Sequence, residues 1–290
     1  MTVLDRAFET ARARRARLIM PEMDEPRIAE AAARLTAEGL AEIIPLSAAR
    51  PAAAYVGHVL RARPKTRPEL AAKMLEKPLM RAAAMVAAGE ADALVAGAAA
   101  PTRRVIEAAS LTIGLAEGIA LPSSFFLMLF PGGRELIFAD CAVVVAPDAA
   151  GLAAIARAAA RSAERLLGEA RVALLSFSTG ASGAGASVEM VREAAASLEG
   201  LASGPLQGDA ALNPAIAAMK GAGAGAGNAN VLIFPSLDAG NIAYKLAQEL
   251  AGAQAIGPFL QGFARPVCDL SRGATVEDIV ASAAVTLALA

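Results

Sequence analysis

Short apolar runs alternate with longer stretches of helical periodicity along most of the chain. The runs at 16–22 and 41–47 flank residues 24–39, where apolar residues recur at helical spacing. Asp24 stands where it can cap that helix and Gly39 where it can end it, so these segments predict a β-α-β unit. Further strands are predicted at 91–97, 123–130, 135–146, 171–177 and 229–235.

Most of these predicted strands are continuous apolar runs, which is typical of strands buried on both faces and predicts an α/β fold. Residues 141–168 predict the end of a strand, a turn at Pro147 and Asp148, and a long helix. We expect the chain to pass into a second domain here, because 290 residues with 56% hydrophobic content can fill two cores.

The overall charge excludes some classes of partner. A net charge of -1 and a pI near 6.0 give no field that attracts nucleic acid or anionic lipid, so an anionic ligand needs a local cluster of donors. The mean hydropathy of +0.48 raises the question of a membrane. The longest uncharged runs, 172–188 and 221–237, are 17 residues each, shorter than the roughly 20 apolar residues of a spanning helix.

The N-terminus is basic but lacks the apolar stretch of a secretory signal. Cys141 and Cys268 form no metal-type or CxxC spacing and fit a reducing cytoplasm. Two glycine-rich patches, 178–187 and 220–230, are candidates for binding phosphate through backbone N–H groups, but neither has a P-loop or dinucleotide fingerprint. A surface loop therefore remains open as the interpretation of each patch.

Chemically distinctive residues gather near the C-terminus. Thr275 and Asp278 form a T-x-x-D capping box, which by itself explains the aspartate. Ser271 and Arg272 lie just upstream, so a hydroxyl and a guanidinium accompany the carboxylate at the start of one helix. Arginine binds phosphate in a planar, bidentate way that lysine does not reproduce, so this group predicts a site for a phosphate-bearing substrate.

These same residues carry a family resemblance. Residues 228–280 resemble the C-terminal signature of phosphate acetyltransferases, above all in NANVLIFP, AGNIAYK and CDLSRGATVEDIV. The resemblance extends along the chain through LIMPEMDEPRIAEAA, GEADALVAGAAAPTRRVIEA, PSSFFLMLF, IFADCAV, ALLSFSTGAS and GPLQGDAAL. It implies two α/β domains with mostly parallel sheets and an active-site cleft between them. Domain I would span 1–142 and be completed by the C-terminal segment 260–290, while domain II would span 143–259.

The resemblance implies the reaction acetyl-CoA + phosphate = acetyl phosphate + CoA, by direct transfer in a ternary complex. Asp278 would then be the base for the thiol, Ser271 would hydrogen-bond the reacting carbonyl or thiol, and Arg272 would hold the phosphate. It also implies a cytoplasmic homodimer whose partners are its small-molecule substrates, with coenzyme A as substrate. No permanently bound cofactor, metal, nucleic acid or membrane is expected.

Other positions match the family around its substrates. The resemblance implies acyl phosphate or coenzyme A binding by Arg61, Ser124, Ser178, Thr179, Asn241, Tyr244, Lys245, Arg103 and Arg104. Helix capping, turn formation or a solvated surface charge explains several of them equally well. His58 is the only histidine and has no nucleophile motif to serve, and a buried structural role fits Cys268 better than a role as acyl carrier.

The chain also departs from the family. Many members carry basic residues where this chain has Glu107, Ala184, Asn228 and Glu249, and this loss of positive charge should weaken phosphate and CoA binding. A non-catalytic acyl-CoA-sensing or dimerisation module, like the related domain of some malic enzymes, therefore stays open, as does a phosphate butyryltransferase. The three residues of the C-terminal site favour an enzyme. A decarboxylating dehydrogenase of related architecture would need clustered metal-binding aspartates, which we do not find.

Overall fold

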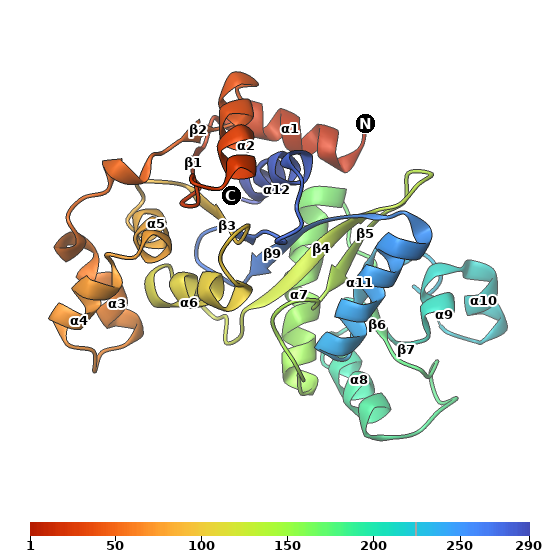
Figure 1. The fold of residues 1–290 in the computed structure, drawn as a ribbon. Coiled ribbons are helices and arrows are strands. Elements are labelled where there is room, and N and C mark those ends of the chain that lie inside the picture. The colour runs from red at the N-terminus through yellow and green to blue at the C-terminus, as the bar shows by residue number, and fades with distance from the viewer. Residues whose placement is uncertain (224) are drawn as a thin grey trace. The chain divides into compact units, whose positions relative to one another are not determined.

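The computed structural model of the chain describes residues 1–223 and 225–290, and it divides into two compact units (Figure 1). Unit 1 contains Met1–Ala120 and Gly257–Ala290, and unit 2 contains Leu121–Ile256. The C-terminal segment thus returns to the unit that the N-terminal residues build. Residue 224, in the second glycine-rich patch, lies outside the described residues. The domain limits expected from the sequence stay a prediction.

The strands of unit 1 run in the order β2-β1-β3-β10-β9. All neighbours are parallel except β10 and β9, and the register places Leu18 opposite Ala93 and Cys268 opposite Val95. Every residue of β3 and β10 is buried, as the continuous apolar run of β3 requires, and in β10 this includes the carboxylate of Asp269. The strands are β1 Arg17–Ile19, β2 Glu42–Ile43, β3 Ala93–Ala96, β9 Gln254–Gln261, which begins in unit 2, and β10 Val267–Asp269.

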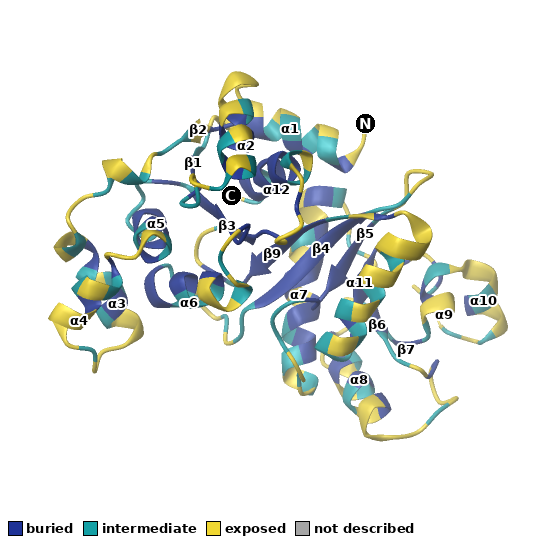
Figure 2. Ribbon diagram, in the orientation of Figure 1, coloured by how far each residue is buried: buried dark blue, intermediate teal, exposed yellow. Residues whose placement is uncertain are grey.

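One helix of unit 1, α12 (Val276–Ala288), is apolar around nearly its whole circumference. Residues 279–287 of this helix are all buried, and it packs against α1, α2, β3 and β10 (Figures 1 and 2). The other helices of the unit are α1 Val3–Arg14, α2 Pro26–Ala37, the 3₁₀ turns Leu46–Ala48 and Ala52–Tyr55, α3 Val56–Ala62, α4 Pro68–Met74, α5 Pro78–Ala87 and α6 Thr102–Thr112.

The strands of unit 2 run in the order β4-β5-β8-β6-β7, antiparallel between β4 and β5 and parallel between the others. Their core includes Phe126, Phe138, Leu232 and Phe234. The strands are β4 Ser123–Leu129, β5 Glu135–Ala139, β6 Val172–Leu175, β7 Ala202–Leu206 and β8 Val231–Ile233. The helices are α7 Ala149–Leu167, α8 Ala186–Ala196, α9 Gly208–Leu212, α10 Pro214–Met219 and α11 Leu237–Ala251.

The predicted α/β class with mostly parallel strands is confirmed, and so is the helix after Pro147, which Asp148 caps through the Gly151 N–H at 2.7 Å. Two local predictions are wrong. The cap of α2 is Glu25 rather than Asp24, because Pro26 occupies the first helical position. The strand expected at 135–146 ends at Ala139. No helix among the described residues combines the length and apolar character that crossing a membrane requires.

Candidate functional site

Ser271 and Arg272 lie on the loop that leaves β10 and enters α12, and both side chains are exposed. The loop turns through a hydrogen bond from the Ala274 N–H to the Ser271 carbonyl, 3.0 Å, while the Gly273 N–H lies 3.4 Å from the Ser271 hydroxyl. Within the described chain, the Arg272 guanidinium makes no hydrogen bond or ion pair. An exposed, unneutralised guanidinium of this kind is available to an anionic ligand.

Asp278 closes the capping box that the sequence predicts. The Thr275 N–H and hydroxyl both donate to Asp278 Oδ2, at 3.0 and 2.8 Å, and the Asp278 N–H donates to the Thr275 hydroxyl at 3.2 Å. The aspartate is half-buried. These bonds fix the direction of its carboxylate, so the cap and a role in proton transfer are compatible uses of one side chain.

A second carboxylate, Asp269, ends β10 just before this loop. It is 1% exposed, and neither of its carboxylate oxygens has a hydrogen-bond partner within the described chain. Burial raises the pKa of Asp269 to about 7; the nearby Thr102 side chain opposes the rise although it does not meet hydrogen-bond geometry, and the charge of Glu22 adds to the rise. The backbone of Gly97 passes so close that a Cβ there would lie 2.4 Å from Asp269 Oδ1, which is why this position is glycine.

Glu22 organises the loop between β3 and α6. Its carboxylate accepts four successive backbone N–H groups, from Gly97 and Ala98 at 2.8 and 2.9 Å and from Ala99 and Ala100 at 3.2 and 2.7 Å. Sequence reasoning missed this residue because its partners lie more than seventy positions away. The PEMDEPR segment itself gives no signal of that contact.

Glu22 also lines a cavity of about 540 Å³ in unit 1. Met74, Leu79 and Met80 form part of its apolar wall, while Lys77, Arg104 and Glu107 add charge. Arg104 Nη1 pairs with Glu107 Oε2 at 2.8 Å, so the acidic residue that departs from the family pattern neutralises a predicted substrate-binding arginine. Arg103, one residue before it on α6, is exposed.

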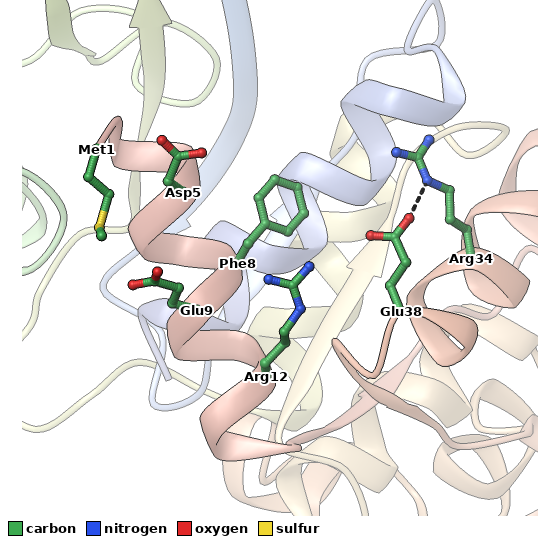
Figure 3. A pocket seen from close by; sticks show the side chains of 7 residues that line it. All are labelled: Met1, Asp5, Phe8, Glu9, Arg12, Arg34 and Glu38. Atoms are coloured by element: carbon green, nitrogen blue, oxygen red, sulfur yellow. Dashed lines mark hydrogen bonds and ion pairs between the residues drawn. The ribbon is translucent and has the colours of Figure 1, made fainter.

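A separate groove of about 560 Å³ lies along α1 and α2, lined by Met1, Asp5, Phe8, Glu9, Arg12, Arg34 and Glu38 (Figure 3). It contains none of the predicted site residues. Arg34 lies at its edge, paired with Glu38 at 2.8 Å and with Glu277 of α12 at 3.3 Å.

Arg61 lies on α3 with its side chain exposed, and its Nη2 is 2.7 Å from His58 Nδ1. Burial, together with the positive charges of Arg61 and Arg50, lowers the pKa of His58. The only histidine therefore stays neutral near pH 7 and leaves the charge of Arg61 uncompensated on that side.

In unit 2, the predicted hydroxyls of the first glycine-rich patch are engaged within the fold. Ser178 is 1% exposed, with its hydroxyl 3.2 Å from that of Ser182 and accepting the Gly183 N–H at 2.8 Å. The Thr179 hydroxyl donates to Gln207 Oε1 at 3.2 Å. The side chains of Ser178 and Thr179 thus form hydrogen bonds that stabilise the glycine-rich loop itself.

Ser124 is fully buried and donates its hydroxyl to Asp140. Asp140 also accepts the N–H groups of Ala142, Val143 and Val144, at 2.9, 3.2 and 2.9 Å, which is why β5 ends here. Burial raises the pKa of Asp140, and these hydrogen bonds oppose the rise.

Helix α11 packs closely on this turn. A Cβ at Gly240 would lie 2.2 Å from the Asp140 carbonyl oxygen, and the Asn241 side-chain amide donates to the Cys141 carbonyl at 3.1 Å. Tyr244 stacks on Phe126 with ring centroids 4.2 Å apart, and Lys245 Nζ lies 4.9 Å from the centroid of the Tyr244 ring. Tyr244 thus packs in the core of unit 2, while Asn241 holds the turn after β5 and Lys245 lies over the Tyr244 ring.

Both cysteines are buried and unpaired. Burial strongly raises the pKa of the Cys268 thiol, which fits the interpretation of a small core residue rather than an acyl carrier. Among the described residues, no three His, Cys, Asp or Glu side chains gather in a way that could hold a metal ion.

Comparison with known proteins adds to this geometry. A family model described as phosphate acetyl/butaryl transferase matches residues 50–287. The phosphate acetyltransferase of Paracoccus denitrificans is 44% identical, covering 99% of this chain and 98% of its own length, and that of Acetivibrio thermocellus is 36% identical, covering 99% and 97%. A phosphotransacetylase crystal structure from Streptococcus pyogenes superposes with a TM-score of 0.93 at 35% identity, covering 99% of this chain and 97% of that one.

Proposed function

The chain belongs to the phosphate acetyl/butaryl transferase family and is therefore an acyltransferase, and we propose that it transfers an acetyl group reversibly between coenzyme A and inorganic phosphate. One observation supports this most directly. The exposed Arg272 guanidinium, which has no partner within the described chain, lies next to the Ser271 hydroxyl on the loop that leads to Asp278.

In the direction of acetyl-CoA formation, we propose that Asp278 takes the proton of the CoA thiol. The sulfur attacks the carbonyl carbon of acetyl phosphate, and the bond between that carbon and the oxygen bridging to phosphorus breaks. The departing phosphate takes up the proton and leaves as HPO4²⁻, which returns Asp278 to its carboxylate form. Ser271 donates a hydrogen bond to the carbonyl oxygen as it gains negative charge, and Arg272 neutralises the phosphate. The reverse reaction uses the same groups, with Asp278 returning the proton to sulfur.

Thr275 supports this role of Asp278. Its two hydrogen bonds go to Oδ2 and hold the carboxylate in one direction on a rigid helix end. A carboxylate that is already held in one orientation loses little conformational entropy when it accepts the proton of the thiol.

We propose that Arg61, Arg103 and Arg104 bind the phosphates of coenzyme A, because their side chains are exposed on α3 and α6. The ion pair of Arg104 with Glu107 reduces the positive charge available there. We therefore expect a higher KM for coenzyme A than a basic residue at position 107 would give.

For the predicted residues of unit 2, Ser124, Ser178, Thr179, Asn241, Tyr244 and Lys245, substrate binding is a proposal that rests on the family resemblance. Their contacts within unit 2 support a second role, in holding the segment after β5, the glycine-rich loop and α11. A homodimeric state and a cytoplasmic location are likewise proposals from the resemblance.

An assay of the purified protein tests the proposal. Acetyl-CoA is incubated with and without inorganic phosphate, the released thiol is measured, and butyryl-CoA is run in parallel. We expect phosphate-dependent release from acetyl-CoA, whereas a preference for butyryl-CoA would assign the butyryl activity. No turnover with either thioester would support the non-catalytic module.

The substitution Arg272→Lys links this activity to the C-terminal loop. Arg265→Lys is a matched control, because Arg265 is also exposed in unit 1 and lies just before β10. We expect Arg272→Lys to raise the KM for phosphate and the control to leave it unchanged. Equal behaviour of the two variants would remove Arg272 from the proposed site.

A further inference from the structure

In the loop between β10 and α12, residues 270–275, Leu270 and Ala274 are buried while residues 271–273 between them are exposed. Leu270 is tied to β3 by a 2.6 Å hydrogen bond from its N–H, and Ala274 is tied to Ser271 within the loop at 3.0 Å. A Cβ at Gly273 would meet no atom within 4 Å, so nothing packs over the middle of the loop. Another element must restrain its backbone if the exposed side chains are to keep one direction.

Arg27, in the first turn of α2, supplies that restraint. Its Nη1 donates to the carbonyl oxygens of Arg272 and Ala274, at 2.9 and 2.7 Å. Its Nε pairs with Glu25 Oε1 at 2.8 Å, which fixes the plane of the guanidinium. Within the described chain, no other residue outside the loop forms a hydrogen bond with residues 271–274.

We propose that Arg27 is a positioning residue for acyl transfer, which holds the loop on both sides of Gly273 and so directs the side chains of Ser271 and Arg272 toward the substrate. This inference rests on the function proposed above for those two residues. Arg27 itself touches only backbone oxygens of the loop.

Arginine suits this task because of its fixed fork of donors. One terminal nitrogen reaches two carbonyl oxygens while Nε is held by a carboxylate, so the two carbonyls are bridged by one rigid plane. A lysine keeps the charge but has a single, flexible donor group. Arg27→Lys should therefore hold the loop in part, and Arg27→Ala should release it.

The chain offers a matched control on the same helix. Arg34 lies two turns further along α2, its side chain is 40% exposed where that of Arg27 is 33% exposed, and each pairs with a glutamate that caps one end of α2. It reaches Glu277 in the first turn of α12 but no residue of the loop. Arg34→Ala should weaken the contact between α2 and α12 but leave the loop of residues 270–275 in place.

The experiment compares wild type with Arg27→Ala, Arg27→Lys and Arg34→Ala in two measurements. Steady-state kinetics give kcat and the separate KM values for phosphate and coenzyme A. Amide hydrogen exchange of the peptide that covers residues 271–275 reports on the loop independently of activity. Arg27→Lys retains a cation on α2 and serves as the informative variant if the alanine variant does not fold.

We expect Arg27→Ala to lower kcat by about 10- to 100-fold, the size of effect that a misplacement of about 1 Å produces, and to raise the KM for phosphate with little change in that for coenzyme A. Exchange in the loop should become faster, Arg27→Lys should recover part of both losses, and Arg34→Ala should resemble wild type. Wild-type kinetics in Arg27→Ala, or an equal loss in Arg34→Ala, would overturn the proposal.

The role of Arg272 in binding phosphate and the role of Arg27 in holding the loop are tested separately by these variants. If Arg272→Lys keeps the wild-type KM for phosphate and full turnover, the proposed role of Arg272 fails. Faster loop exchange in Arg27→Ala would still establish that Arg27 holds the loop. Unchanged exchange would show that Arg27 does not hold it.

Discussion

Replacing Asp269 by asparagine should change how the stability of the protein depends on pH. The carboxyl group is 1% exposed and has no hydrogen-bond partner among the described residues, and burial raises its pKa from 3.8 to about 7. Between these two values, the folded protein keeps a proton that the unfolded chain loses. Stability therefore falls as the pH rises through this window and levels off above pH 7. Asparagine, which does not titrate, removes that dependence.

The two pKa values give the magnitude. A difference of about 3 units corresponds to about 4 kcal/mol in full, at about 1.4 kcal/mol per unit. Within an experimental range of pH 5 to pH 8, the folded and unfolded states differ in protonation only from pH 5 to about pH 7, which is about 2 pH units. The free energy of unfolding of Asp269→Asn relative to wild type should therefore rise by about 3 kcal/mol over this range. The Thr102 side chain and the nearby Glu22 are already included in the folded value.

Urea unfolding of both proteins at several pH values between 5 and 8 measures this difference, and equal m-values check that both unfold alike. Asp140→Asn is a control, because Asp140 is as deeply buried but accepts three backbone N–H groups and the Ser124 hydroxyl. At pH 8 it should destabilise the protein, since an amide nitrogen replaces an acceptor. Parallel pH profiles of wild type and Asp269→Asn would contradict this prediction, because they would mean that Asp269 has the same charge in the folded and unfolded states.

Four further predictions concern the proposed site. Asp278→Asn should lower kcat by about 100-fold or more and cost about 1 kcal/mol of stability, since the residue both accepts the proton and caps α12; full turnover in a folded variant would reduce Asp278 to a cap. Arg272→Lys should raise the KM for phosphate in initial-rate assays while the Tm stays unchanged, and an unchanged KM would argue against a bidentate contact. Glu107→Gln should lower the KM for coenzyme A, because it frees Arg104 from an ion pair, and a higher KM would show that the pair itself is needed. Cys268→Ala should keep turnover per folded molecule, because the thiol is buried and its pKa is raised; loss of activity with the fold intact would reopen an acyl-enzyme route.

The sequence predicts strands β1 to β6 and β8, because each lies within a short apolar run. It misses β7, since Gly204 and Pro205 are typical of loops. Gly204 is nevertheless required in this strand, because a Cβ there would lie 2.8 Å from the Cβ of Leu174. β9 is missed for a similar reason, with Gly257 and Pro258 in its middle, and β10 is only three residues long.

In the candidate site, too, the sequence predicts the features that depend on neighbouring residues and misses those that depend on distant contacts. The capping box of Thr275 and Asp278 is local, so three residues of spacing suffice to predict it. Arg27 and Glu22 act on partners 245 and 75 positions away, and no local pattern records such a contact. The missing hydrogen-bond partners of Asp269 are also a property of packing alone.

The return of Gly257–Ala290 to unit 1 has a consequence for biosynthesis. β10 lies between β3 and β9, so the sheet of this unit lacks an inner strand until the ribosome has delivered that segment. Leu121–Ile256 are synthesised before that segment and can fold first. Until β10 is added, the N-terminal part of unit 1 leaves the apolar edge of β3 unpaired. The same late segment carries Ser271, Arg272 and Asp278. A nascent chain therefore gains its proposed catalytic residues and the inner strand of unit 1 together, after the residues of unit 2 have been synthesised.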